Sequence, residues 1–321
     1  MKPQVVPLNF EYPYFRKRDG SISIWDDPSI KGGIALIDNY QPLTNLGSVL
    51  GKANSYNYME QKDVTLLKMV GECIAANEDQ LKRLMSTVMS RSQVSLRLKK
   101  FRRYGFVERW DLNSLDDPDL KPPSPFTLGL AGYIFLKHFY NKEFFMEPTR
   151  WQTLGLSAIQ RYVAINEIKC QIYETQGLRG FKWQGCILNN PQLINSFAAI
   201  EALTEVGNLN FVLERVQQSK DYIAYLSERL MKWDQVYQQY NLLPIQGMSQ
   251  HKTSLIISVS CFSLAEEIIT KLNLELYKLP CIFCIEEKVE SDSFTKSFYV
   301  KKPDASKNKA ELLQVDMPFF K

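Results

Sequence analysis

The strongest constraint in this sequence is a dense block of positive charge within a segment of helical pattern. Residues 82–109 contain nine lysines and arginines and a single acid, Glu108, so the block carries +8. The whole chain carries +4, and the other residues therefore sum to −4. Ionised side chains are costly to bury without partners, so the block must present most of them at a surface. A focused basic surface of this kind is typical of phosphate binding.

Apolar residues within the block follow the period of an α-helix. Val94, Leu98 and Phe101 recur at i, i+4 and i+7, which places them on one helix face. That face can pack on preceding helices. Glycine is favoured just after a helix end, so the pattern predicts a helix over residues 90–104 that stops at Gly105.

The opposite face of this helix carries side chains that suit contact with duplex DNA. Small polar groups near a helix N-terminus suit base edges in the major groove, and cations further along suit backbone phosphates. The residues expected at base edges are Ser92, Gln93, Ser95 and Arg97. The phosphates are expected to be held by Lys99, Lys100, Arg102, Arg103 and Arg109, and Arg91 joins the same DNA-binding set.

Two other interpretations of this helix stay open. Its basic face could be a solvated or protein-binding surface without any role in DNA binding. Gln93 follows Ser90 by three residues, so it could act only as the capping-box partner of that serine.

The elements around the basic helix form a recognisable order. Patterning predicts helices at 62–76, 78–89 and 130–140 and strands at 106–112 and 126–128. With the stretch Ser90–Arg109 and the run Phe126–Tyr133, this order resembles the winged helix-turn-helix superfamily over residues 63–140. The resemblance implies that the helix 90–104 enters the major groove of DNA and that a basic wing follows it.

The chain divides into three parts by its patterning. Residues 1–58 are interrupted by prolines and glycines, and we expect an irregular arm with short strands at 21–25 and 33–38. Residues 59–147 are the expected winged helix-turn-helix domain, and residues 148–321 the expected α/β domain. The α/β domain is predicted from helices at 154–173, 220–240 and 264–274 and strands at 181–188, 197–203, 210–216, 254–260 and 281–286.

The expected fold class is α+β, with the second domain resembling a degenerate restriction-endonuclease-like fold. A winged helix followed by such a domain resembles the replication-relaxation family of plasmid and mobile-element proteins, over residues 60–290. In that family the second domain is similar to PD-(D/E)xK nucleases, whose carboxylates hold a divalent ion and whose lysine stabilises charge at the attacked phosphate.

This sequence departs from the nuclease pattern. Glu214 takes the acidic position, but Val216 stands where the lysine belongs, and Asn195-Ser196-Phe197 stands where Pro-Asp is expected. The sequence therefore predicts a protein that is not an enzyme, with no catalytic residues, metal or cofactor. The second domain would serve scaffolding, dimerisation or partner binding, and the alternative is a metal-dependent nuclease that uses Glu214.

An apolar stripe runs along the predicted helix 220–240, at Ile223, Leu226, Leu230, Trp233, Tyr237 and Tyr240. This 3-4 spacing favours packing on the sheet, and the alternative is a seam between two copies of the chain. A homodimer would suit a winged helix because two-fold proteins read paired half-sites on DNA.

The cysteines and the hydropathy indicate a cytoplasmic protein that has no membrane segment. The six cysteines are scattered, which does not fit a disulfide framework. Cys281 and Cys284 lie in a strand-like run, so they are expected to be buried rather than zinc-binding or redox-active. No stretch approaches 18 apolar residues.

The favoured function is binding of double-stranded DNA by a mobile-element protein, in plasmid replication, conjugative transfer or transcription regulation. A restriction-like nuclease and a non-DNA-binding adaptor are the alternatives. Magnesium-dependent cutting of DNA would favour the nuclease, and absence of salt-dependent DNA affinity would favour the adaptor.

Overall fold

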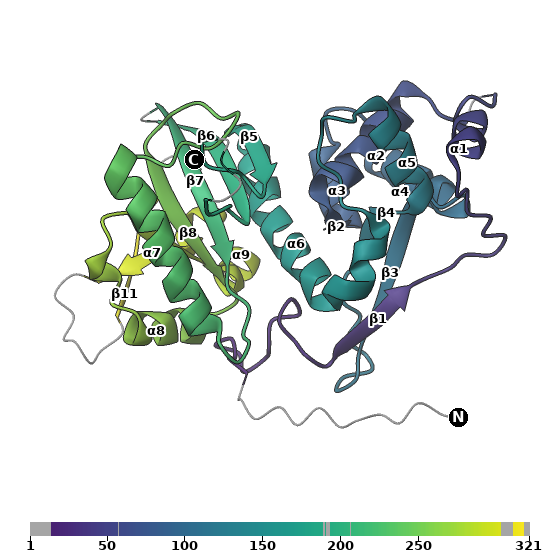
Figure 1. Ribbon diagram of the computed structural model, residues 1–321. Helices are drawn as coiled ribbons and strands as arrows, with labels where there is room; N and C mark the ends of the chain where they lie inside the picture. The colour runs from purple at the N-terminus through teal and green to yellow at the C-terminus, as the bar shows by residue number, and fades with distance from the viewer. Residues whose placement is uncertain are drawn as a thin grey trace.

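The computed structural model in Figure 1 describes residues 14–56, 58–188, 190, 193–205, 207–302 and 311–317. These residues form helices and two separate sheets, which confirms the α+β class. We call the four-stranded sheet with its helices the N-terminal unit and the seven-stranded sheet with its helices the C-terminal unit. One long helix, α6, lies between them. Residues 1–13 of the predicted arm fall outside the described residues.

The N-terminal unit follows the predicted order of elements except for one additional short strand, β2. It contains α2 (Gln61–Cys73), β2 (Ala75–Asn77), α3 (Glu78–Leu84), α4 (Arg91–Arg103), β3 (Val107–Ser114), β4 (Pro125–Leu128) and α5 (Leu130–Phe139). Its sheet has the order β1-β3-β4-β2, with antiparallel pairing throughout. The predicted helix 90–104 is confirmed as α4, and Ser90 caps it in a capping box with Gln93. Its apolar face, with Val94, Leu98 and Phe101, is buried in the core of the unit.

The arm differs from the expected irregular segment. Residues 46–53 form helix α1 (Leu46–Ala53), which the glycines at 47 and 51 concealed, because Asn45 caps it and Val49 packs into the core. The strand expected at 21–25 is wrong, since these residues form turns. The strand expected at 33–38 lies earlier, as β1 (Ile30–Ile34), and pairs with β3.

Residues 15–27 of the arm pass over the C-terminal unit before β1 begins. Phe15 packs against the core beneath α7 and α8, and Lys17 pairs with Glu290 at 2.9 Å. Asp26 pairs with Arg215 at 2.9 Å. Residues 15–27 of the arm therefore pack on the C-terminal unit.

The C-terminal unit is a mixed sheet between two helical layers (Figure 1). Its strands are β5 (Leu178–Trp183), β6 (Ala198–Thr204), β7 (Gly207–Arg215), β8 (Thr253–Val259), β9 (Cys281–Ile285), β10 (Phe298–Lys301) and β11 (Leu312–Gln314), adjacent in that order. Strands β7, β8 and β9 run parallel, and the other neighbouring strands pair antiparallel. α7 (Tyr222–Tyr240) and α8 (Phe262–Lys271) cover one face, and α6 (Trp151–Glu174) covers the other with α9 (Glu286–Ser291).

The apolar stripe of α7 packs on the sheet. Leu226, Leu230 and Trp233 are buried against strand residues such as Val212 and Leu255. The sheet-packing interpretation of this helix is confirmed. The stripe is therefore not available as a dimer seam, which removes the feature that favoured a homodimer.

The two cysteines of the CIFC run lie in β9, as expected for strand cysteines. Burial raises the pKa of the Cys281 thiol to about 12 and that of Cys284 further, so both stay protonated at neutral pH. Among the described residues, no helix is both long and apolar enough to cross a membrane.

Two glycines offer a matched test of the packing in the N-terminal unit. A Cβ at Gly132 in α5 would lie 2.1 Å from the Phe106 carbonyl oxygen, whereas a Cβ at Gly51 in α1 would meet nothing within 4 Å. We expect Gly132→Ala to lower the free energy of unfolding by about 1–3 kcal/mol, since backbone must move. Gly51→Ala should leave it unchanged or raise it by up to about 1 kcal/mol through helix propensity. Urea denaturation of both variants measures this, and equal effects would contradict the close α5–β3 approach.

Candidate nucleic-acid interface

The exposed face of α4 is a narrow stripe of four residues. Ser92, Leu96, Lys99 and Arg103 are all exposed and recur at i, i+4, i+7 and i+11. They lie opposite the buried face of the helix. The stripe joins one polar group, one apolar group and two cations along about three turns.

Two of the predicted DNA-binding cations are instead held inside the N-terminal unit. Lys100 Nζ lies 2.8 Å and Arg97 Nε 3.3 Å from Oδ1 of Asp63, whose side chain is fully buried at the start of α2. Arg97 also pairs with Glu60 at 2.9 Å, and Lys100 donates to the Tyr58 carbonyl. A buried carboxylate needs such partners, so these cations anchor α4 to α2. The sequence predicted a contact of Arg97 with a base edge, but in the structure its guanidinium points to Asp63.

The polar residues predicted near the start of α4 also have internal partners. Gln93 Oε1 accepts from the Ser90 backbone at 3.2 Å, which confirms the interpretation of Gln93 as a capping partner. Ser95 donates to Glu78, and Ser92 lies 3.2 Å from the Ser90 hydroxyl. Arg91 pairs with Asp79, but both side chains are exposed and the pair can exchange with another anion.

The two remaining arginines of the set contact backbone or hydroxyl groups. Arg102 donates to the Ala35 carbonyl at 2.8 Å, and Arg109 donates to the Ser124 hydroxyl at 2.9 Å. Neither arginine has an ion pair with a described residue, but Asp111 interacts electrostatically with Arg102 and Glu78 with Arg109, so this sheet edge carries mixed charge.

Lys99 and Arg103 are the predicted cations of α4 without an ion pair or side-chain hydrogen bond to any described residue. Arg103 has only the Tyr104 ring beside it, 5.4 Å from its guanidinium carbon. Leu96, one turn before Lys99, exposes 67% of its surface. Leu96 was not among the predicted contact residues, because only polar side chains were expected on this face. Its helical phase, two residues from both Val94 and Leu98, was the available signal.

The loop between β3 and β4 contradicts the expected basic wing. Residues 115–124 carry Asp116, Asp117 and Asp119 against a single Lys121, and the aspartates are exposed. The tip of this hairpin would repel phosphates, and positive charge is confined to its base. The basic wing was predicted from Arg109 in the first strand of the hairpin, but the loop that follows this strand is acidic.

Glu108 stands out at the base of the same hairpin. Burial on β3 raises the pKa of its carboxyl to about 7, because desolvation disfavours the charged form. It pairs in register with Thr127 across the sheet. Its ionisation therefore falls close to neutral pH.

This shift predicts a pH-dependent stability. The pKa of the Glu108 carboxyl rises from 4.5 in the unfolded chain to about 7 in the folded protein. The stability that the protonated carboxyl contributes is therefore fully present below pH 4.5 and is lost as the pH rises through 7. We expect Glu108→Gln to match the wild type near pH 4.5 and to become more stable than it as pH rises to 7.5. Thermal unfolding of both proteins between pH 4.5 and 8.5 measures the gap. A gap that is constant over this range would contradict the raised pKa.

The nuclease-like position in the C-terminal unit is filled by paired charges. Glu214 near the end of β7 is buried, and its Oε1 accepts from Trp233 Nε1 at 2.9 Å and from Arg229. The next residue, Arg215, is held by Glu286 at 2.8 Å. Val216 is buried where a lysine would be needed. Among the described residues, no three His, Cys, Asp or Glu side chains gather closely enough to hold a metal ion.

Comparisons of this chain with protein-family models, with curated proteins and with solved structures gave no match. The evidence for an interface therefore comes from the residues of this chain alone.

Proposed function

We propose that the N-terminal unit is a winged helix-turn-helix domain that binds duplex DNA through α4. The order α2-β2-α3-α4-β3-β4, with the short β2 paired to β4, supports this resemblance. α4 follows α3 after a tight connection, as a recognition helix does, and presents its stripe away from the core. The role in replication, transfer or transcription of a mobile element is proposed on the family resemblance alone.

The observation that carries the proposal is a pair of exposed cations on α4, Lys99 and Arg103. Lys99 and Arg103 are exposed and have no ion pair with any described residue, while the acidic residues of α2 and α3 compensate Arg91, Arg97 and Lys100. Two unpaired cations one helical turn apart suit successive phosphate contacts along a groove. Leu96, one turn before Lys99 on the same face, suits apolar contact with a thymine methyl group.

The C-terminal unit supports a non-catalytic role in this proposal. Strands β5 to β9 lie in sequence order with β6 antiparallel to its neighbours, behind α6, in the manner of a restriction-endonuclease-like core. Glu214 and Arg215 at its centre are engaged with Arg229 and Glu286. We propose that this unit is a scaffold that holds the DNA-binding unit and contacts partners.

The test is fluorescence anisotropy of the full chain on random duplex DNA over a range of salt. Each phosphate contact contributes about −0.9 to the slope of log affinity against log salt, so Lys99→Ala/Arg103→Ala should reduce the slope by about 1.8. The affinity should fall at every salt concentration, because two phosphate contacts are lost.

The matched control removes two lysines from the C-terminal unit. Lys232 and Lys271 are exposed and each pairs with a glutamate one turn away. Lys232→Ala/Lys271→Ala should keep the wild-type affinity and slope. Equal losses in both double variants would mean that net charge rather than α4 governs binding. Absence of wild-type binding at low salt would favour the protein adaptor.

Leu96 gives a second, independent prediction. Leu96→Glu places a carboxylate in the centre of the stripe and should weaken DNA binding at least about tenfold by repulsion of phosphate, at unchanged thermal stability. Leu276, which is 73% exposed in the C-terminal unit, supplies the control variant Leu276→Glu. Competition binding on one duplex compares the two. Wild-type affinity for Leu96→Glu would exclude the α4 stripe from the DNA interface.

A further inference from the structure

A cavity of about 600 Å³ lies where the arm, α6, α7 and the end of β7 meet. Its walls come from residues 26–32 of the arm and β1, residues 156–161 of α6, residues 214–219 after β7 and the first turns of α7. This volume lies in the range of small-molecule sites. The cavity also opens at the carboxyl end of a parallel strand, where ligands bind in open α/β sheets.

Three arginines line this cavity, and two of them have carboxylate partners. Arg215 lies between Glu286 and Asp26, at 2.8 and 2.9 Å. Arg229 pairs with Glu214 and also donates to the Asn195 carbonyl. Both cations are thereby held in the wall, so they are engaged with the protein itself.

The third arginine, Arg161 of α6, has neither a hydrogen bond nor an ion pair among the described residues. Its Nε is buried without any acceptor, and its guanidinium stacks on the Phe197 ring at 4.2 Å. Burial lowers the pKa of this guanidinium, an effect that Glu214 offsets in part from a greater distance. A desolvated cation without a partner destabilises a fold, whereas an anion in the cavity would satisfy it.

The remaining charges define the ligand. Lys31 also lines the cavity and has no ion pair to a described residue. Four cations, Lys31, Arg161, Arg215 and Arg229, face the space with three carboxylates, Asp26, Asp27 and Glu214, so the lining keeps a net charge of +1. Phosphate carries nearly two negative charges and matches the donor fork of arginine. Tyr222 and Tyr225 supply ring surface for an organic group beside it.

We propose that this cavity binds a phosphate monoester of mononucleotide size, with Arg161 as the residue that binds the phosphate. The partner is a small molecule rather than a DNA strand, because the cavity has the volume of a small-molecule site. The site is independent of DNA binding by α4, which belongs to another part of the chain.

The experiment is isothermal titration calorimetry of the full chain with inorganic phosphate and with adenosine monophosphate. Wild type should bind both probes at one site, with the nucleotide tighter. Arg161→Met should raise the dissociation constant by at least about tenfold, which corresponds to 1.4 kcal/mol. The exposed Arg150, just before α6 and outside the cavity lining, gives the control Arg150→Met, which should bind as the wild type does.

Thermal unfolding separates a ligand-binding arginine from a structural one. Ligand-free Arg161→Met should be at least as stable as the wild type, because it removes a buried Nε that has no acceptor, and it should gain no stability from phosphate. If Arg161→Met does not fold, Arg161→Lys, which keeps the charge without the fork, should show the weaker binding. Wild type without binding at 10 mM probe, equal binding by Arg161→Met, or displacement of the probe by a duplex oligonucleotide would each overturn the proposal.

Discussion

The buried amide of Asn166 is the contact on which the arrangement of this protein depends. Its Nδ2 donates at 2.8 Å to the carbonyls of Cys73 and Ala75, which flank Ile74. Ile74 has a φ of 63°, a conformation that a β-branched residue rarely adopts. Such a strained backbone conformation persists only where surrounding contacts hold it in place. Asn166 does so from α6, and it thereby fixes the turn between α2 and β2 against the helix that also covers the C-terminal sheet.

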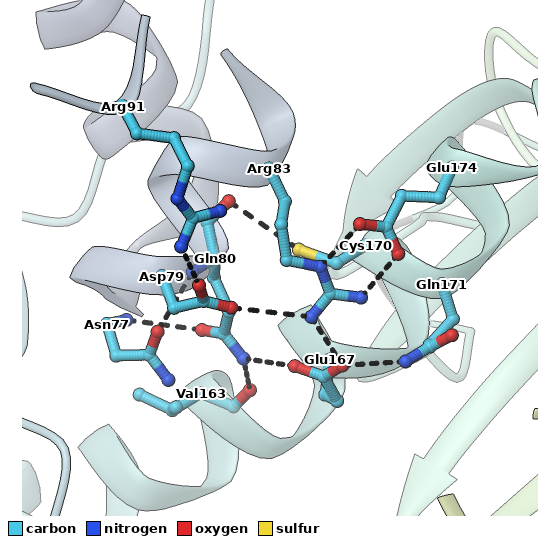
Figure 2. Close-up of polar contacts among 10 residues, drawn as sticks. All are labelled: Asn77, Asp79, Gln80, Arg83, Arg91, Val163, Glu167, Cys170, Gln171 and Glu174. Carbon is cyan, nitrogen blue, oxygen red and sulfur yellow. Dashed lines mark hydrogen bonds and ion pairs between the residues drawn. The ribbon is translucent and has the colours of Figure 1, made fainter. Parts of the chain in front are cut away.

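The rest of α6 continues this connection. Gln80 donates to the Val163 carbonyl at 2.9 Å, and Arg83 bonds both Glu167 and Glu174, as Figure 2 shows. On its other side, α6 places Ile165, Ile168 and Ile172 in the core of the C-terminal sheet. Apolar packing and the buried amides set the geometry, and the partly buried Arg83 pairs add to it. The N-terminal unit and the C-terminal unit therefore share one helix as a wall.

Local patterns in the sequence predicted most helices and strands, because each has its own period and caps. Val94, Leu98 and Phe101 located α4, and the alternation of apolar residues located the sheet strands. The elements that were missed depend on distant contacts. β2 is three residues long and exists through its pairing with β4, and β1 is positioned by β3. Asn45 was the one local signal for α1, and the glycines on either side of Val49 outweighed it.

The candidate site was harder to predict than the fold, because a charge count does not show which charges are paired. Asp63 and Glu60 come before the basic block in sequence, and only the packing of α2 on α4 brings them to Arg97 and Lys100. The Asp79–Arg91 pair likewise depends on the angle between α3 and α4. The acidic residues of the β3–β4 loop were readable from the sequence, and so was the helical phase of Leu96.

These pairings rank the cations by how readily DNA could recruit them. Lys99 and Arg103 have no ion pair within the described parts of the chain, so a phosphate would displace no carboxylate there. Arg91 comes next, because 62% of its side chain and 55% of that of Asp79 are exposed, and water already screens the pair. Arg97 and Lys100 come last, since taking them away would leave the fully buried Asp63 uncompensated, a strongly destabilising change. If DNA binds as proposed, two or three cations of α4 would contact phosphates, while Arg97 and Lys100 hold the helix in position against α2.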